Sequence, residues 1–357
     1  MNKKVKIVVI GASGVLGELI CSELNHLFEN SIKLFVGDYH TKRGKITADK
    51  FNAEFCETNT DNIDKLSTSL SGKDIAVVTI NKIEPVIQKI CLEKSILCID
   101  VTVFYSFAKK VQDLYSCNTD LKSTSVLMAG FIPGLSGLLL KKAINDFDEI
   151  NESNITLLQN TNAKAGASGI IDMLKIISEP VSTIFDNKNI DLSGFSLKRE
   201  IRIPRSDINY KVRLISHSEK HLLLEKLHIK NLNYWTAWNS SFFNILVSFI
   251  RSTGLINFVT KKIKKEAMKK MIKHDENKSE ETVLIADVKG YKGKLEQSKY
   301  LVIKSFSDYG TTAKITAALA EIILHKKTEG VCFPFEITTI DEMLDIMNDK
   351  RIKYHEY

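Results

Sequence analysis

A glycine-rich turn near the N-terminus constrains the fold more than any other feature of this sequence. Residues 5–10 (VKIVVI) form a continuous β-branched run, which is typical of a strand buried on both faces of a parallel sheet. This run passes directly into the turn GASGVLG (residues 11–17) and then into a segment whose apolar residues recur at helical spacing. The order of strand, glycine turn and helix predicts a Rossmann βαβ unit.

The glycines of this turn have separate physical roles. Gly11 permits a tight turn out of the strand, Gly14 lets the backbone approach a pyrophosphate, and Gly17 lets the helix pack closely on the sheet. The pyrophosphate would sit at the helix N-terminus, where free N–H groups and the helix dipole favour an anion. The turn predicts a dinucleotide site with cofactor contacts from Gly11, Ser13, Gly14, Val15, Leu16 and Gly17.

The second predicted strand (IKLFVGD) ends at Asp38, 21 residues after Gly17. A carboxylate at this place can accept hydrogen bonds from the adenosine ribose hydroxyls, and it would repel a 2′-phosphate. Lys42 and Arg43, expected on the following loop, could instead clamp that phosphate. The sequence therefore leans towards NAD and leaves NADP open.

Three later apolar runs, at 73–81, 95–103 and 124–131, alternate with helical segments and predict further parallel strands. The expected fold class is α/β, a doubly wound parallel sheet. Ligands of such sheets bind beyond the carboxyl ends of the strands. The further cofactor contacts expected there are Thr79, Asn81, Thr102, Gly130 and Pro133, and the candidate proton donors are Asp100, Tyr105 and Tyr309.

These segments together resemble the saccharopine dehydrogenase-like oxidoreductases. The resemblance rests on KIVVIGASGVLG, on DIAVVTIN with CIDVTV, on AGFIPGLSGLLL and on TAALAEIILHKKTEGVCFPFE. It implies a discontinuous Rossmann domain (1–150 plus 309–357) and an inserted α+β substrate and dimerisation domain (151–308), so a homodimer is expected. The implied chemistry is NAD(P)-linked hydride transfer at a C=N or C=O bond of an amino-acid-like metabolite.

Two departures from the resemblance keep other functions open. Amino-acid-handling members commonly carry an acid where this chain has Ile132, and the segment DYGTTA (308–313) looks closer to relatives associated with lipid-like enoyl substrates. The alternatives are an enoyl reductase acting on a lipid-like C=C bond and a dinucleotide-binding sensor without catalysis.

Composition narrows the class of protein further. The net charge of +7 is spread along the chain, and no nucleic-acid-binding module is recognisable, so a nucleic-acid partner is not expected. Six cysteines at irregular spacings, without C-x-x-C, favour a reducing compartment and disfavour a zinc or disulfide framework. No stretch reaches the roughly 18 apolar residues of a spanning helix. We therefore expect a cytoplasmic protein without a metal.

Two further segments of the inserted region carry expectations of their own. His217 and His221 superficially resemble a metal pair, but the polar surroundings predict solvated loop histidines. Residues 255–273 repeat an apolar residue every four positions and hold seven lysines, which can form a basic amphipathic helix. Such a helix can make peripheral contact with an anionic membrane or cap the domain with its lysines in water.

Overall fold

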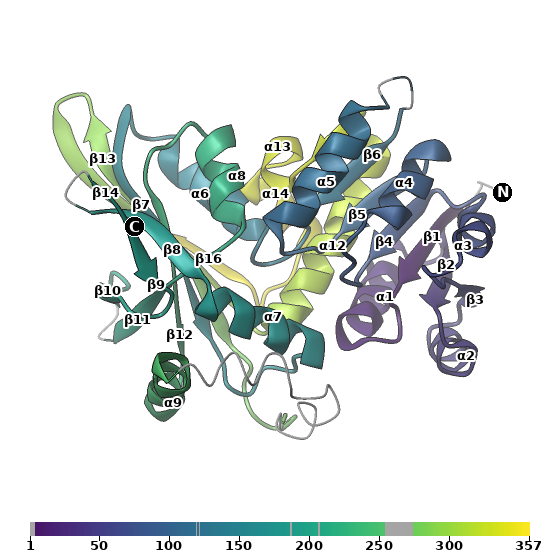
Figure 1. Cartoon of the computed structure of the whole chain (residues 1–357), viewed down its shortest axis with the longest axis horizontal. Helices are drawn as coiled ribbons and strands as arrows, with labels where there is room; N and C mark the ends of the chain where they lie inside the picture. Colours follow the sequence, from purple (N-terminus) through teal and green to yellow (C-terminus); the bar gives the residue numbers. More distant parts are fainter. Residues whose placement is uncertain (1–3, 119, 121, 186–187, 206–207, 254–273) are drawn as a thin grey trace. The chain divides into compact units, whose positions relative to one another are not determined.

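The computed structural model describes residues 4–118, 120, 122–185, 188–205, 208–253 and 274–357 (Figure 1). The chain divides into two compact units. The first unit contains Met1–Leu138 and Tyr309–Asn348, and the second contains Leu139–Asp308 and Asp349–Tyr357.

The first unit is built on a seven-stranded, wholly parallel sheet. Its strands, in spatial order, are β15 (Gly330–Cys332), β6 (Thr124–Leu127), β5 (Leu97–Asp100), β4 (Ile75–Val78), β1 (Val5–Ile10), β2 (Ile32–Asp38) and β3 (Glu54–Glu57). This arrangement confirms the predicted doubly wound α/β fold. The strand order reverses between β1 and β4, where such folds bind ligands beyond the carboxyl ends of the strands.

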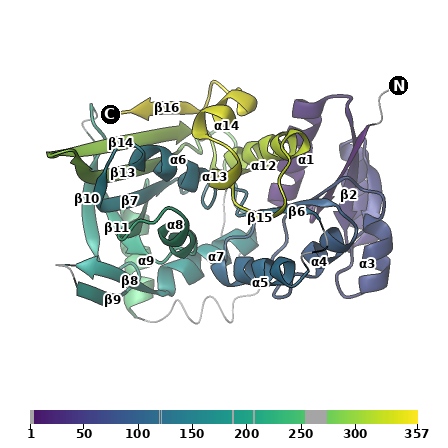
Figure 2. The ribbon, with the colours of Figure 1, turned by 90° about the horizontal axis from the view of Figure 1, so that it is seen from above.

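Helices cover both faces of this sheet. Figure 2 shows α1 and α12 on one side and α3, α4 and α5 on the other. The described helices of the first unit are α1 (Val15–Phe28), α2 (Thr41–Lys50), α3 (Ile63–Leu70), α4 (Val86–Glu93), α5 (Tyr105–Ser116), α12 (Asp308–His325), α13 (Pro334–Ile337) and α14 (Ile340–Met347). Helix α6 (Leu135–Ile144) begins in the first unit and ends in the second. The α3 and α4 face buries a continuous apolar cluster that includes Val8, Ile10, Leu66, Val78 and Ile90. The central strands β1 and β4 are largely buried on both faces, which explains their unbroken apolar runs.

An ion pair joins the two ends of the first unit. Lys314 on α12 places its Nζ 2.9 Å from an Oε of Glu23 on α1, and the Lys314 side chain is only 8% exposed. The C-terminal residues of this unit also extend its sheet, because β15 pairs in parallel with β6. The N-terminal and C-terminal parts therefore share one core.

The second unit contains a seven-stranded mixed sheet. Its strands, in spatial order, are β10 (Lys198–Arg202), β11 (Asn209–Ile215), β12 (Leu232–Trp238), β7 (Glu149–Gln159), β13 (Thr282–Lys292), β14 (Leu295–Ser305) and β16 (Lys353–Glu356). The β13–β14 hairpin turns at Gly293, which has a positive φ of 60°. A separate hairpin is formed by β8 (Pro180–Phe185) and β9 (Lys188–Ser193). Among the described residues of this unit, the helices are α7 (Ala167–Ser178), α8 (Glu219–Lys226) and α9 (Ser241–Ser252).

A buried ion pair shows that this second sheet is strongly curled. Arg199 on β10 binds both carboxylate oxygens of Asp287 on β13, although three strands separate β10 from β13 in the sheet. Asn154 on β7 also donates to Asp287, and its Oδ1 accepts the indole N–H of Trp235. Trp235 and Val212, the residue opposite Arg199 on β11, both belong to the apolar core of this unit.

Three details of the structure differ from the sequence predictions. Lys42 and Arg43 lie in the first turn of helix α2, not in a loop. His217 is not solvated, because it is 5% exposed and stacks on the Tyr234 ring with the centroids 4.5 Å apart. Its burial lowers the pKa of the imidazole to about 3. Strand β16 and residues 139–150 belong to the second unit, whereas the boundaries implied by the family resemblance include them in the first domain.

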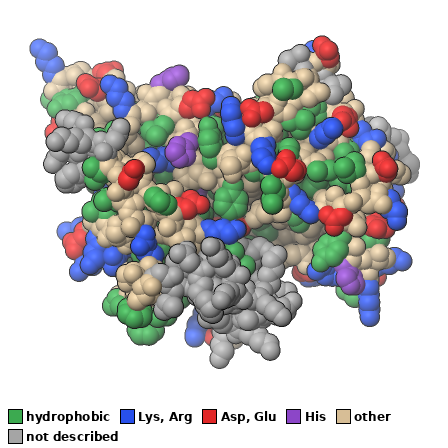
Figure 3. Space-filling model, in the orientation of Figure 1, with side chains coloured by type: hydrophobic (Ala, Val, Ile, Leu, Met, Phe, Trp, Pro, Cys, Tyr) green, Lys and Arg blue, Asp and Glu red, His purple; other side chains and the backbone are tan. Residues whose placement is uncertain are grey.

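Helix α9 carries apolar side chains on its exposed surface. Phe242, Ile245 and Phe249 are 75%, 66% and 60% exposed, and green side chains gather over α9 at the lower left of Figure 3. The basic segment 255–273 lies outside the described residues, so its expected membrane contact stays a prediction. None of the described helices is long and apolar enough to cross a membrane.

Candidate functional site

The turn after β1 has the geometry that its glycines predict. Gly11 adopts a φ of +85°, and a Cβ there would lie 2.5 Å from Ile80 Cγ2 and 2.6 Å from Thr79 Oγ1. The Gly11 N–H donates to the Gly37 carbonyl at 2.9 Å, which ties the turn to β2. Thr79 in turn donates its hydroxyl to the Ile10 carbonyl. The turn is therefore held between the residues that follow β4 and those that end β2.

The other two glycines of the turn differ in what surrounds them. A Cβ at Gly17 would lie 2.3 Å from the Gly11 carbonyl oxygen, so only glycine lets α1 approach the strand this closely. Gly14 is the exposed N-cap residue of α1, and the nearest atom to a Cβ there would be the Gly11 oxygen at 3.3 Å. Gly17 thus serves packing, whereas Gly14 keeps the outer side of the turn open.

The N-terminus of α1 opens at this turn. The N–H groups of the first helical turn, which begins at Val15 and Leu16, have no helical carbonyl four residues earlier to bind. Together with the helix dipole they attract an anion, and the missing side chain at Gly14 leaves room for a pyrophosphate to reach them. The residues present therefore fit a dinucleotide phosphate.

Asp38 ends β2 beside the same turn, and its carboxylate is bound on both oxygens. Arg43 donates its Nε–H to Oδ2 at 2.9 Å and an Nη2–H to Oδ1 at 2.8 Å, and the His40 backbone N–H also donates to Oδ1. Burial acts to raise the pKa of the Asp38 carboxyl, but the hydrogen bonds from Arg43 and His40 outweigh it and hold that pKa below its ordinary value of 3.8. Asp38 is therefore ionised at neutral pH.

Helix α2 is joined to the glycine turn. Thr47 Oγ1 lies 3.0 Å from the Ser13 hydroxyl, so α2 and the turn form neighbouring parts of one rim. A Cβ at Gly44 would lie 2.3 Å from the Phe55 ring and 3.1 Å from the Asp38 Cβ. This close approach is what brings Arg43 onto Asp38.

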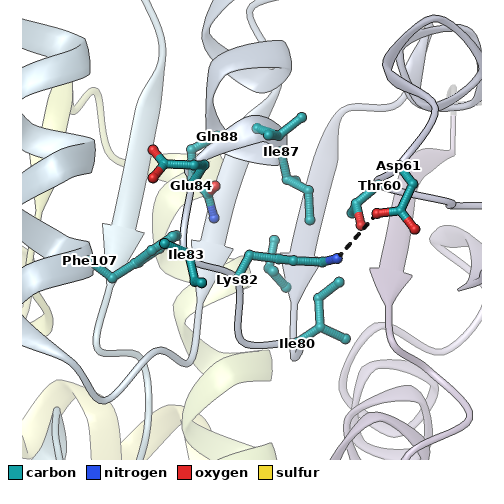
Figure 4. A pocket seen from close by; sticks show the side chains of 11 residues that line it. Thr60, Asp61, Ile80, Lys82, Ile83, Glu84, Ile87, Gln88 and Phe107 are labelled. Atoms are coloured by element: carbon teal, nitrogen blue, oxygen red, sulfur yellow. Dashed lines mark ion pairs between the residues drawn. The ribbon is translucent and has the colours of Figure 1, made fainter.

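A cavity of about 270 Å³ lies beyond the ends of β3 and β4, next to this rim (Figure 4). Ile80, which touches the Gly11 turn, also lines the cavity, so the two features are adjacent. Figure 4 shows Lys82 reaching across the opening towards Asp61, with Nζ 4.0 Å from Oδ1. The cavity has an apolar wall and a charged opening, which suits a flat ring with polar edges.

Asp100 ends β5 and is buried, with 2% of its surface exposed. Burial raises the pKa of its carboxyl to about 7, although hydrogen bonds from the Thr102 N–H and the Gln88 amide oppose that shift. The Thr102 N–H lies 2.7 Å from Oδ1, and Gln88 donates to Oδ2. These contacts hold the segment after β5 in place.

A turn after β6 completes this edge of the sheet. The Gly130 N–H donates to the Pro133 carbonyl at 3.0 Å, and Gly134 has a positive φ of 126°. The Phe131 N–H donates to Thr312 Oγ1 on α12 at 3.1 Å. Tyr309 lies three residues earlier on the same helix, so α12 carries it close to this turn.

The structure brings most of the expected site residues to one edge of the first sheet. The glycine turn, Asp38, Thr79, Thr102 and the Gly130 turn all follow carboxyl ends of its strands. Asn81 is exposed, and Tyr105, the first residue of α5, is half-buried. Gln88 and Thr47 were not predicted, because no motif marks a helical side chain that binds a neighbouring element. Among the described residues, no cluster of three or more metal-ligating side chains occurs.

Comparison with solved structures identifies the fold. Saccharopine dehydrogenase (L-Glu forming) from Saccharomyces cerevisiae matches with a TM-score of 0.72 and 12% identity, covering 99% of each chain. Homospermidine synthase from Legionella pneumophila, solved in complex with NAD, matches with a TM-score of 0.66 and 13% identity over 99% of this chain and 91% of that one. An engineered D-amino acid dehydrogenase bound to NADP+ matches with a TM-score of 0.50 and 12% identity, covering 94% of this chain and 95% of that one.

At these identities the likeness shows the fold alone. It confirms, at the level of the fold, the resemblance that the sequence motifs indicate. No protein-family model matches the sequence, and no curated protein does.

Proposed function

We propose that this chain is an NAD(P)-dependent oxidoreductase that transfers a hydride at a C=N or C=O bond of an amine-bearing metabolite. The observation that carries the proposal is the Gly11 turn, which opens the N-terminus of α1 at the point where the strand order reverses between β1 and β4. Sheets of this kind bind nucleotides at that point.

The neighbouring structures support the substrate class. A saccharopine dehydrogenase, a homospermidine synthase and a D-amino acid dehydrogenase share this fold, and their names all denote amine-bearing molecules. Two of them were solved with NAD or NADP+. We therefore favour an amine or amino-acid substrate over an enoyl one.

Each group of side chains has a proposed task. The α1 N-terminus binds the pyrophosphate, the rim at Asp38 and α2 binds the adenosine ribose, and the cavity at Ile80 receives the adenine ring. The bound nicotinamide supplies or accepts the hydride. Because Asp100 is buried and bound on both oxygens, we assign it to positioning the segment after β5. Tyr105 and Tyr309, both half-buried, remain the candidate proton donors.

The direct test is titration of NADH and NADPH by fluorescence on the wild type and on Gly14→Val. The valine side chain fills the open side of the turn, so we expect at least a tenfold loss of affinity for whichever dinucleotide binds. Ser22→Val is the matched control, because Ser22 is an exposed residue of the same helix. Absence of binding by the wild type, or equal binding by wild type and Gly14→Val, would overturn the proposal.

Substrate class is tested separately. Oxidation of NADH and NADPH is followed with pairs of amines and keto acids and, in parallel, with enoyl substrates. Turnover with an amine and carbonyl pair supports the proposed class, whereas turnover with enoyl compounds alone would overturn it.

A further inference from the structure

Both carboxylate oxygens of Asp38, the acid at the end of β2, already accept hydrogen bonds from the protein. An Asp in this place binds NAD by accepting hydrogen bonds from the ribose hydroxyls. The Asp38 side chain is only 1% exposed, and its two oxygens accept three N–H groups from Arg43 and His40. Its charge is also neutralised by the guanidinium. Asp38 is therefore poorly placed to recognise a ribose that carries only hydroxyl groups.

Arg43 has the opposite character, because it is held in place but half-exposed. A guanidinium has five N–H groups in a rigid plane, and Asp38 receives the Nε–H and one Nη2–H. The guanidinium carbon lies over the Tyr39 ring, 5.2 Å from the ring centroid, which is within the range of a cation–π contact. The side chain remains 50% exposed, so the outer N–H groups of Arg43 are presented to solvent. A preorganised guanidinium of this kind suits a phosphate.

The local charge favours the same ligand. The Asp38–Arg43 pair is neutral as a unit, and the exposed Lys42 precedes Arg43 in the first turn of α2, whereas Lys45, two residues after Arg43, lies on another side of the helix. The rim therefore carries net positive charge. The Thr47–Ser13 contact places this rim beside the turn that would hold the pyrophosphate. A second phosphate on the adenosine ribose would thus meet Arg43 while the pyrophosphate binds α1.

We propose that the dinucleotide of this site is NADP(H), with Arg43 as the residue that binds the ribose 2′-phosphate and sets the specificity. Asp38 is a positioning residue that orients Arg43, rather than the ribose ligand that its place in the sequence indicates. This inference rests on the proposed dinucleotide site and deepens it.

The test compares dissociation constants for NADPH and NADH, and for the fragments 2′,5′-ADP and 5′-ADP, on wild type and Arg43→Gln. We expect the wild type to bind NADPH at least about tenfold more tightly, and Arg43→Gln to lose that preference while its affinity for NADH changes less than about threefold. Lys45→Gln is the matched control and should keep most of the preference. Thermal unfolding confirms that each variant is folded.

The outcomes separate the two proposals. Equal or tighter binding of NADH by the wild type overturns the NADP assignment and leaves the dinucleotide site standing. If Arg43→Gln loses affinity for NADPH and NADH equally, the role of Arg43 in specificity is overturned, because the substitution would then act only through the structure. Asp38→Asn should weaken the binding of NADPH more than the binding of NADH, since it disturbs the orientation of Arg43. Failure of the wild type to bind either dinucleotide overturns the proposed function itself.

Discussion

Gly17 packs against Gly11 so closely that a Cβ on Gly17 would stand 2.3 Å from the Gly11 carbonyl oxygen. The obstacle is backbone, which cannot rotate away as a side chain can. Gly17→Ala should therefore destabilise the protein by about 2–3 kcal/mol, as overpacking does elsewhere. Gly14→Ala, on the open side of the same turn, should cost less than about 1 kcal/mol. Urea unfolding followed by circular dichroism measures both, and equal midpoints for the two variants would contradict the close packing.

The ion pair at Asp38 predicts a stability that depends on pH. Its folded-state pKa lies below the ordinary value of 3.8, so its stabilisation is present above that value and is lost as the pH falls through the folded-state pKa. Asp38→Asn should therefore be less stable than the wild type at pH 7, with a difference that shrinks below pH 4. Unfolding free energies at pH 7, 5 and 3 test this. A difference that stays constant over that range would contradict it.

Asp100 predicts a trend of the opposite sign. Its folded-state pKa is raised to about 7, so the folded state holds the proton more tightly than the unfolded state. The stabilisation is complete below the unfolded value of 3.8 and is lost as the pH rises through about 7. Asp100→Asn carries no titrating proton and should flatten the fall in stability between pH 5 and 8. Urea midpoints at several pH values provide the measurement, and parallel curves for the two proteins would argue against it.

The Arg199–Asp287 pair should contribute strongly to the second unit. Arg199→Met leaves the Asp287 carboxylate buried with only the Asn154 amide as its described hydrogen-bond donor, so we expect a loss of about 3 kcal/mol. The double variant Arg199→Met with Asp287→Asn should recover part of that loss, because it no longer buries a charge. Guanidinium unfolding of the single and double variants tests the pair. A single variant within about 0.5 kcal/mol of wild type would show that the pair is dispensable.

The first sheet could be predicted because its central strands are buried on both faces and read as unbroken apolar runs. Helix α2 could not, since TKRGKITADK has no apolar stripe and forms where Gly44 lets it pack on Phe55 and Asp38. Strand β3 (EFCE) and strand β15 (GVC) contain only two adjacent apolar residues each, so neither forms the apolar run that marks the central strands. In each case the deciding contacts come from other parts of the chain.

The candidate site shows the same division. The roles of the glycines follow from local geometry, so spacing alone indicates them. The ion-pair partner of Asp38 cannot be predicted from spacing. Lys42 and Arg43 have the same charge, and only the helical turn decides which of them faces the carboxylate. His217 is a related case, because its polar neighbours in the sequence predict a surface position, while Tyr234, distant in sequence, covers it.

The Lys314–Glu23 contact and the addition of β15 to the edge of the sheet have a consequence for synthesis on the ribosome. The first 138 residues of the first unit emerge long before the residues that complete it, because roughly 170 residues of the second unit are translated in between. At about 5–20 residues per second, this delay lasts roughly 10 to 30 seconds. During that time the β6 edge and the Glu23 face of α1 have no partner from α12 or β15. A nascent chain stalled before residue 309 should therefore be more sensitive to protease than the released protein.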